Sequence, residues 1–423
     1  YLYRTRDGGR TWTLIVDGIR NGDFANAVRE DPRQRGLLYA ATELGAYVSF
    51  TDGDHWQPLQ MNLPSTSVRD IDVHGDDVVI ATHGRGFWVL DDVSSLRQIA
   101  METSHDSTRL FAPAVAIRVR PAGFTGTPLP KDEPTAVNPA FGARLDYRLA
   151  ATPKQPVQLA IFNDAGQLVR RYSSADVPPA YEPDTAGIAP EWFTAPSVLA
   201  TTPGLHRFVW PLHYAALPAS SGGNAFADGV LAPPGRYVVE LTVDGTSFKQ
   251  PLTVVADPRV HLAPSAFAQQ FELARAVEAA QERLASAQVA ASQLHDAIRA
   301  ARKSPATGTD DPLRTLDAKV VDIAGIVDVS NPGNAGLLPP DNTHSFAFLA
   351  QALGKLANAT DDADAAPSVD ARNGYRTLVA LLDPTLAQWQ QLLASDLPAV
   401  NAGLRRAGRP ELTLVPPGHK PEP

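Results

Sequence analysis

Residues 3–12 of this sequence read YRTRDGGRTW, and residues 47–56 read YVSFTDGDHW. Both stretches begin with tyrosine, carry a hydroxyl residue two positions on and a glycine near the middle, and end with tryptophan, 44 residues apart. A second match aligns residues 41–50, ATELGAYVSF, with residues 81–90, ATHGRGFWVL, at a spacing of 40 residues. A period of about 40–45 residues with four short strands per unit is typical of a β-propeller blade.

Each unit contains stretches in which apolar residues alternate with small or polar ones, the pattern of half-buried antiparallel strands. Between them, Asp-Gly, Gly-Gly and Gly-Asp pairs supply the positive φ of tight turns. The predicted strands are residues 1–5, 24–30, 37–41, 46–50, 56–59, 68–73, 78–81 and 87–90. Closed propellers have about 4–8 blades. We therefore expect residues 1–95 to form the terminal blades of an incomplete propeller. Its blades would form an open arc, or would close into a ring only with another chain.

The first stretch resembles the Asp-box, S/T-x-D-x-G-x-T-W, of BNR-repeat propellers. Its matching residues are Thr5, Asp7, Gly9 and Trp12; the second, degenerate copy carries Ser49, Gly53 and Trp56, with Thr51 where the family has Asp. Residues 38–92 more specifically resemble the last blades of large bacterial sortilin-like BNR proteins, often labelled glycosyl hydrolases. The resemblance implies a periplasmic or secreted protein.

The Asp-box is interpreted as a turn device that holds no substrate. Asp7 can accept hydrogen bonds from the turn amides that follow it, and Gly9 supplies a permissive φ. Trp12 is expected to pack between strands, so that Trp12→Ala would cost about 3–5 kcal/mol. In the resembling propellers this hairpin lies on the face opposite the substrate face, so Asp7 is not a candidate acid.

The candidate site lies on the other face, where the loop between the second and third strands of a blade opens. Glu43 lies in this loop of one blade, and His83 and Arg85 lie in the same loop of the next. Arg69 and Asp70 begin the neighbouring inner strand. Glu43 and Asp70 are the candidate catalytic carboxylates, and Arg69, His83 and Arg85 the candidate ligand-binding residues. Alternatively, His83 and Arg85 hydrogen-bond backbone groups where the ring closes. We expect Glu43 and His83 to lie nearer each other than either does to Asp7.

Residues 110–260 stay β-rich but lose the blade period. The predicted strands are residues 114–119, 143–150, 157–162, 168–172, 206–212, 236–243 and 247–255. About seven short strands favour an immunoglobulin- or fibronectin-like sandwich. Long Pro-, Gly- and Ser-rich loops interrupt it near residues 121–140, 178–203 and 216–234.

Residues 264–410 predict an antiparallel helical bundle. Ser265 is the expected N-cap of a helix that ends near residue 303, and further helices are predicted at 312–327, 345–359 and 370–406. Pro384 is expected to break or cap the last one. Residues 411–423 are Pro-rich and predict a flexible tail.

Composition excludes several classes of protein. The chain of 423 residues has no Cys, which excludes disulfides, thiolate zinc sites and Cys nucleophiles. A net charge of −9 without a basic stripe argues against a nucleic-acid partner. No apolar run reaches the roughly 18 residues of a membrane span. No metal-binding or phosphate-loop motif was found, so neither metal nor cofactor is expected.

The leading interpretation is a fragment of an extracytoplasmic propeller protein that recognises or scaffolds a polypeptide or glycan. The alternative is an Asp-box glycoside hydrolase whose active site lies mostly in missing blades, because hydrolysis needs two carboxylates across the bond. The Arg triad and Tyr-Glu pair of a sialidase cannot be identified. A third possibility is a structural module that docks through its helical bundle. We therefore expect the fragment alone to hydrolyse no common aryl-glycoside.

Overall fold

The computed structural model describes the whole chain except residues 103–106, 121–138, 181, 183–195, 222–223, 303–310, 327–341 and 415–423. Much of the predicted loops near 121–140 and 178–203, and most of the predicted tail, lie outside the described residues. The chain divides into two compact units. The first comprises Tyr1–Asp176, Ser197–Pro211 and Gly235–Val255, and the second comprises Val177–Pro196, Leu212–Pro234 and Ala256–Pro423. The predicted segments 1–95 and 110–260 thus largely share one unit.

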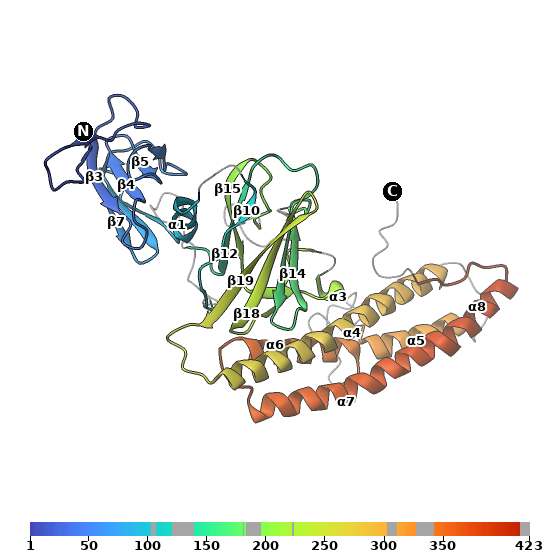
Figure 1. Cartoon of the computed structure of the whole chain (residues 1–423). Coiled ribbons are helices and arrows are strands. Elements are labelled where there is room, and N and C mark those ends of the chain that lie inside the picture. The colour runs from blue at the N-terminus through green and yellow to red at the C-terminus, as the bar shows by residue number, and fades with distance from the viewer. Residues whose placement is uncertain are drawn as a thin grey trace. The chain divides into compact units, whose positions relative to one another are not determined.

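The first unit begins with short antiparallel sheets (Figure 1). A two-stranded ribbon joins β1 (Tyr3–Arg4) and β2 (Thr13–Leu14). The next sheet has the order β3 (Ala25–Glu30), β4 (Leu38–Thr42), β5 (Ala46–Ser49) and β6 (Gln57–Pro58). The third has the order β7 (Val68–His74), β8 (Asp77–Thr82) and β9 (Phe87–Leu90). Helix α1 (Ser94–Ala100), which the sequence did not predict, follows β9.

The two 44-residue copies share their strand register. In the ribbon, Tyr3 pairs with Leu14, and in the second sheet Tyr47 pairs with Pro58. The turns between these strands match as well. The Thr5 hydroxyl accepts from the Gly9 N–H at 2.8 Å, and the Ser49 hydroxyl accepts from the Gly53 N–H at 2.9 Å. The ribbon therefore has the same structure as the outer half of the second sheet.

The second and third sheets share a bulge in their first strands. In the second sheet the register shifts between Ala25 and Ala27, and in the third it shifts between Val68 and Asp70, in each case opposite the end of the neighbouring strand. The loops between the second and third strands of these sheets differ in length by one residue. The Thr42 N–H donates to the Gly45 carbonyl, whereas the Thr82 N–H donates to the Gly86 carbonyl. Beyond these loops the structural spacing is therefore 41 residues, and Tyr47 corresponds to Trp88 rather than to Phe87.

Apolar side chains fill the space between successive sheets. One cluster joins the second and third sheets and includes Tyr39, Val48, Ile71 and Val78. Another lies between the ribbon and the second sheet and includes Leu38, Tyr47 and Trp56. The expectation that Trp12 is buried is wrong: Trp12 is 60% exposed, whereas Trp56 is 1% exposed. Trp56 is covered by the ribbon, but within the described residues no sheet covers the corresponding side of the ribbon itself.

Arg97 binds helix α1 to the turns that follow β3 and β7. Its Nε donates to both carboxylate oxygens of Asp31 at 3.0 Å, and its Nη2 donates to the Gly75 carbonyl at 3.0 Å. The Arg97 guanidinium also pairs with Asp76. Asp31 and Asp76 lie in the turns after β3 and β7, so one side chain holds the same end of both sheets.

Two larger sheets complete the first unit. One has the order β11 (Ala116–Arg118), β19 (Thr246–Ala256), β18 (Gly235–Val243), β13 (Gln158–Asn163) and β14 (Leu168–Ser173). The other has the order β10 (Arg109–Leu110), β12 (Ala143–Leu149) and β15 (Gly204–Trp210). The sheets contact each other through aromatic rings: Trp210 lies edge-on to Tyr237 at 5.4 Å, and Tyr172 lies 4.7 Å from Phe208.

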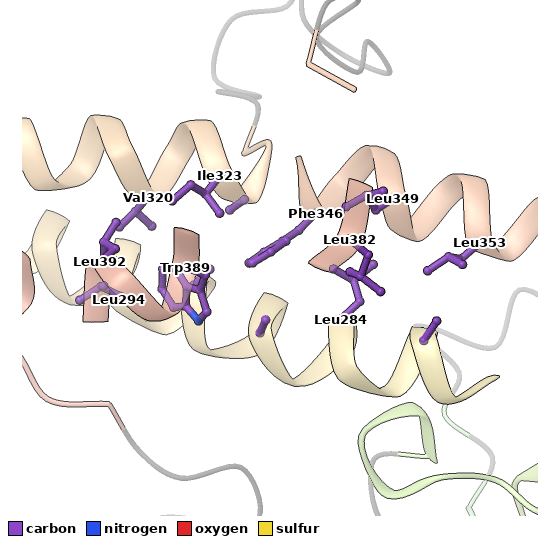
Figure 2. Packing of buried hydrophobic residues seen from close by; sticks show 14 of the residues in the cluster. Leu284, Leu294, Val320, Ile323, Phe346, Leu349, Leu353, Leu382, Trp389 and Leu392 are labelled. Carbon is purple, nitrogen blue, oxygen red and sulfur yellow. The ribbon is translucent and has the colours of Figure 1, made fainter. Parts of the chain in front are cut away.

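The second unit is mainly helical. Its helices are α4 (Pro264–Arg302), α5 (Pro312–Ala324), α6 (Phe346–Asp361), α7 (Val369–Gln391) and α8 (Leu397–Arg406), with a π-helical turn at Leu392–Asp396. One apolar core joins them, and Figure 2 shows Leu284 of α4 near Leu382 of α7, with Phe346 and Trp389 close by. An unpredicted hairpin of β16 (His213–Ala215) and β17 (Asp228–Leu231), with α3 (Pro218–Ser221) between its strands, packs on α4.

Two predictions about helix ends are wrong. Helix α4 begins at Pro264, so Ser265 lies inside its first turn and is not the N-cap. Pro384 neither breaks nor caps a helix, because α7 continues through it to Gln391. Leu382 and Trp389, on either side of Pro384, are buried in the core. Packing on both sides outweighs the hydrogen bond that proline cannot make.

Candidate functional site

The predicted rim is built by two equivalent pairs of loops. The Glu43 N–H donates to the Phe24 carbonyl at 3.0 Å, and the His83 N–H donates to the Ser67 carbonyl at 2.8 Å. Each bond ties the loop between the second and third strands of a sheet to the residues just before the first strand. The Ser49–Trp56 turn lies at the opposite end of β5. Glu43 and His83 thus occupy corresponding loops, away from the Asp-box-like turns.

Glu43 connects the second sheet to the third. Its carboxylate accepts hydrogen bonds from the Ser67 hydroxyl at 2.8 Å and from the Asn26 amide at 3.3 Å. The Arg69 guanidinium lies 3.5 Å away. The hydrogen bonds from Ser67 and Asn26, aided by the charges of Arg69 and His83, hold the pKa of Glu43 below its ordinary value. The carboxylate is therefore ionised at neutral pH and poorly suited to donate a proton.

Asp70 forms an ion pair with an arginine outside the Glu43 cluster. The bulge in β7 leaves both Arg69 and Asp70 exposed, although they are adjacent. Asp70 accepts from the Arg29 guanidinium at 2.9 Å. Glu43, by contrast, pairs with Arg69. The structure therefore brings Glu43, Arg69 and His83 together, whereas Asp70 faces an arginine of the neighbouring inner strand.

His83 and Arg85 lie in an exposed loop. The Arg85 N–H donates to the Thr82 hydroxyl at 3.1 Å, and the Trp88 indole donates to the Arg85 carbonyl at 3.0 Å. These contacts fix the backbone of the loop and leave the Arg85 side chain exposed. Gly84 and Gly86 both have positive φ, at 84° and 72°, which explains the glycines on either side of Arg85.

Sequence reasoning missed the residues that hold the Glu43 loop. Asp23 accepts from the Leu44 N–H at 3.1 Å and from the Thr42 hydroxyl at 2.8 Å. Asn26 donates to the Val68 carbonyl at 2.9 Å as well as to Glu43. Both polar residues lie at the predicted start of an inner strand, but the groups they bind are 17 to 42 residues away in the chain, so no local motif indicates these bonds.

Asp7 forms a local turn. Its carboxylate accepts from the N–H groups of Arg10 and Thr11, each at 2.9 Å, and from the Thr11 hydroxyl at 2.7 Å. Hydrogen bonds from the Thr11 backbone and hydroxyl are the main cause that lowers the pKa of Asp7 to about 2. In the second copy the Thr51 hydroxyl accepts from the His55 N–H at 2.9 Å, so Thr51 takes the place of Asp7.

Neither a metal centre nor a membrane span emerges from the described residues. No three His, Asp or Glu side chains there are arranged to hold a metal ion. None of the described helices is both long and apolar enough to cross a bilayer.

Comparisons with known proteins identify no family. No family model matches the chain, and no curated protein matches it. One solved structure, the extracellular domain of a hybrid two-component system from B. thetaiotaomicron, is similar at 9% identity and a TM-score of 0.17. That match covers 60% of this chain and 28% of the other. At so low a TM-score, the similarity supports no conclusion on fold or function.

Proposed function

We propose that this chain belongs to an extracytoplasmic propeller protein of the sortilin-like BNR type and that it recognises a polypeptide or glycan at the rim. In this proposal the repeats are terminal blades, the two larger sheets form an immunoglobulin-like sandwich, and the helices form a scaffolding bundle. The repeated register, bulge and turn bonds of the small sheets support a blade-like repeat. These features recur between repeats of this chain and support the proposal at the level of the internal repeat.

One observation favours recognition over hydrolysis: both candidate carboxylates already have partners. Glu43 is bound by Ser67 and Asn26 with a lowered pKa, and Asp70 is bound by Arg29. A glycosidase acid needs a raised pKa, so that it keeps a proton to give to the leaving group. The exposed side chains of His83 and Arg85 remain as donors for a ligand, and Arg85 suits a carboxylate or another anionic group.

The test is a binding screen against glycan and peptide arrays. The full chain is compared with Arg85→Ala and with Arg10→Ala, an exposed arginine in the Asp7 turn. We expect Arg85→Ala to weaken any ligand found and Arg10→Ala to leave it unchanged. Equal binding by both variants would argue against the rim. An aryl-glycoside assay runs in parallel, and turnover that is lost in Glu43→Gln would establish the hydrolase instead.

A further inference from the structure

The outer edge of β9 is open, whereas the corresponding strands carry a partner. Strand β1 pairs with β2, and β5 pairs with β6. Among the described residues, no strand pairs with β9 on the side away from β8. Phe87 is 80% exposed and Val89 is 53% exposed. An apolar edge strand without Lys, Pro or a bulge lacks the usual protection against pairing with another chain.

An apolar cavity lies beside this open edge. Part of its wall comes from the third sheet and part from the second sheet and the loop that follows it. The third sheet contributes Val78, Ile80 and Trp88, and the second sheet and its following loop contribute Ala46, Leu59 and Leu63. They correspond one for one to the residues around Trp56 between the ribbon and the second sheet. These are Leu38, Ala40, Tyr47, Leu2, Ile15 and Ile19.

Backbone bonds confirm the correspondence. The Ile15 N–H donates to the Leu2 carbonyl at 2.9 Å, and 44 residues later the Leu59 N–H donates to the Ala46 carbonyl at 2.8 Å. The same spacing relates Ile19 N–H, bound to the Val16 carbonyl, to Leu63 N–H, bound to the Gln60 carbonyl. The cavity is thus the place that a tryptophan fills one repeat earlier, because among the described residues the third sheet has no outer strand that would bring one.

We propose that this cavity and the β9 edge bind an extended polypeptide segment of another protein, which adds as a fourth strand and inserts a tryptophan side chain. Trp56 shows the contacts expected. Its indole N–H donates to the Ile15 carbonyl at 2.9 Å, and its backbone N–H donates to the Asp17 carbonyl at 2.9 Å. The corresponding acceptor for the indole at the cavity is the Leu59 carbonyl. Strand addition supplies backbone hydrogen bonds, and the pocket selects the side chain.

The wall differs from the Trp56 site at one turn. A Cβ on Gly18 would lie 2.0 Å from the Trp56 carbonyl oxygen, and the corresponding residue is Asn62. The added backbone must therefore lie farther from this turn than Trp56 does. The cavity shares Trp88 with the Arg85 loop, but it uses neither the Glu43 nor the Arg85 side chain, so this proposal holds or fails independently of the proposed function.

The test uses the full chain and a labelled peptide with the sequence of residues 53–60, GDHWQPLQ. Fluorescence anisotropy should show saturable binding, and a peptide with alanine in place of tryptophan should bind at least about tenfold more weakly. Ile80→Phe, which fills the cavity, should weaken binding to the same extent. Val79→Phe, on the opposite face of the same strand, is the matched control and should leave binding unchanged.

Several results would overturn the proposal. These are the absence of saturable binding up to millimolar peptide, equal binding of the tryptophan and alanine peptides, or equal effects of Ile80→Phe and Val79→Phe. A dimer that forms without peptide and disappears in Trp12→Ala would show that a second copy, not another protein, occupies the cavity. If Ile80→Phe does not fold, the two peptides still decide the question.

Discussion

Trp12 and Trp56 end two copies of the same turn, 44 residues apart, yet Trp12 is 60% exposed and Trp56 is 1% exposed. The strand register and turn bonds are shared, so local sequence does not set the difference. Burial depends on the neighbouring sheet: the ribbon covers Trp56, and its indole donates to the Ile15 carbonyl. The tryptophan of the same motif therefore contributes differently to the free energy of unfolding at its two positions.

The two tryptophans should differ accordingly on substitution. We expect Trp56→Ala to lower the free energy of unfolding by about 3–5 kcal/mol, because it leaves a cavity between the ribbon and the second sheet. Trp12→Ala should change it by no more than about 0.5 kcal/mol, as for most surface substitutions. Urea unfolding followed by circular dichroism measures both. A larger effect for Trp12 than for Trp56 would contradict the burial observed here.

The repeat explains why the small sheets were predictable. Each strand from β3 to β9 lies within one residue of its predicted bounds, because period and alternation reflect backbone geometry directly. The one-residue insertion before Gly86 escaped the alignment, since Phe87 and Tyr47 are both aromatic. The placement of Glu43 in the loop between the second and third strands was also predictable from the repeat. Its partners Ser67 and Asn26 were not, because they arise from packing between two sheets.

The failures elsewhere share one cause. Pro384 was expected to end a helix because proline lacks an N–H, but the helix is held by its buried neighbours. The hairpin of β16 and β17 is too short for an alternation signal, and the contact of Tyr214 with Phe271 of α4 helps to anchor it. Tertiary contacts decide such elements, and a single sequence does not display them.

Arg97 and Arg33 offer a matched test of a buried ion pair. Arg97 pairs with Asp31, whose side chain is 0% exposed, whereas Arg33 reaches Asp76 with a side chain that is 57% exposed. Arg97→Ala leaves a buried carboxylate without its cation, so we expect a loss of about 3–5 kcal/mol. Arg33→Ala should cost at most about 1 kcal/mol. Similar losses in chemical denaturation would show that Arg97 does not hold the two turns.

The Asp7 turn should respond to acid. The pKa of Asp7 is lowered from 3.8 to about 2 by hydrogen bonds, first of all from Thr11. Because the folded value lies below the unfolded one, the carboxylate stabilises the turn above pH 3.8, and this contribution is lost as the pH falls through about 2. Carboxyl carbon shifts in an NMR titration, assigned with Asp7→Asn, report the midpoint. A midpoint near 4 would mean that the turn bonds do not persist in solution.

Pro384 should make the helical unit less stable than it could be. Proline has no N–H to donate to the Ala380 carbonyl, and Pro384 itself is exposed, so its replacement removes no core contact. We expect Pro384→Ala to raise the free energy of unfolding by about 1–2 kcal/mol, after allowing for the greater freedom of the unfolded chain. Pro312→Ala is the control, because Pro312 lies in the first turn of α5, where no such bond is lost, and the change there should be about 0.5 kcal/mol or less. Thermal and urea unfolding of both variants measure the difference. If Pro384→Ala were destabilising, the proline would be required by the packing of α7, and the account of a helix that merely tolerates it would be wrong.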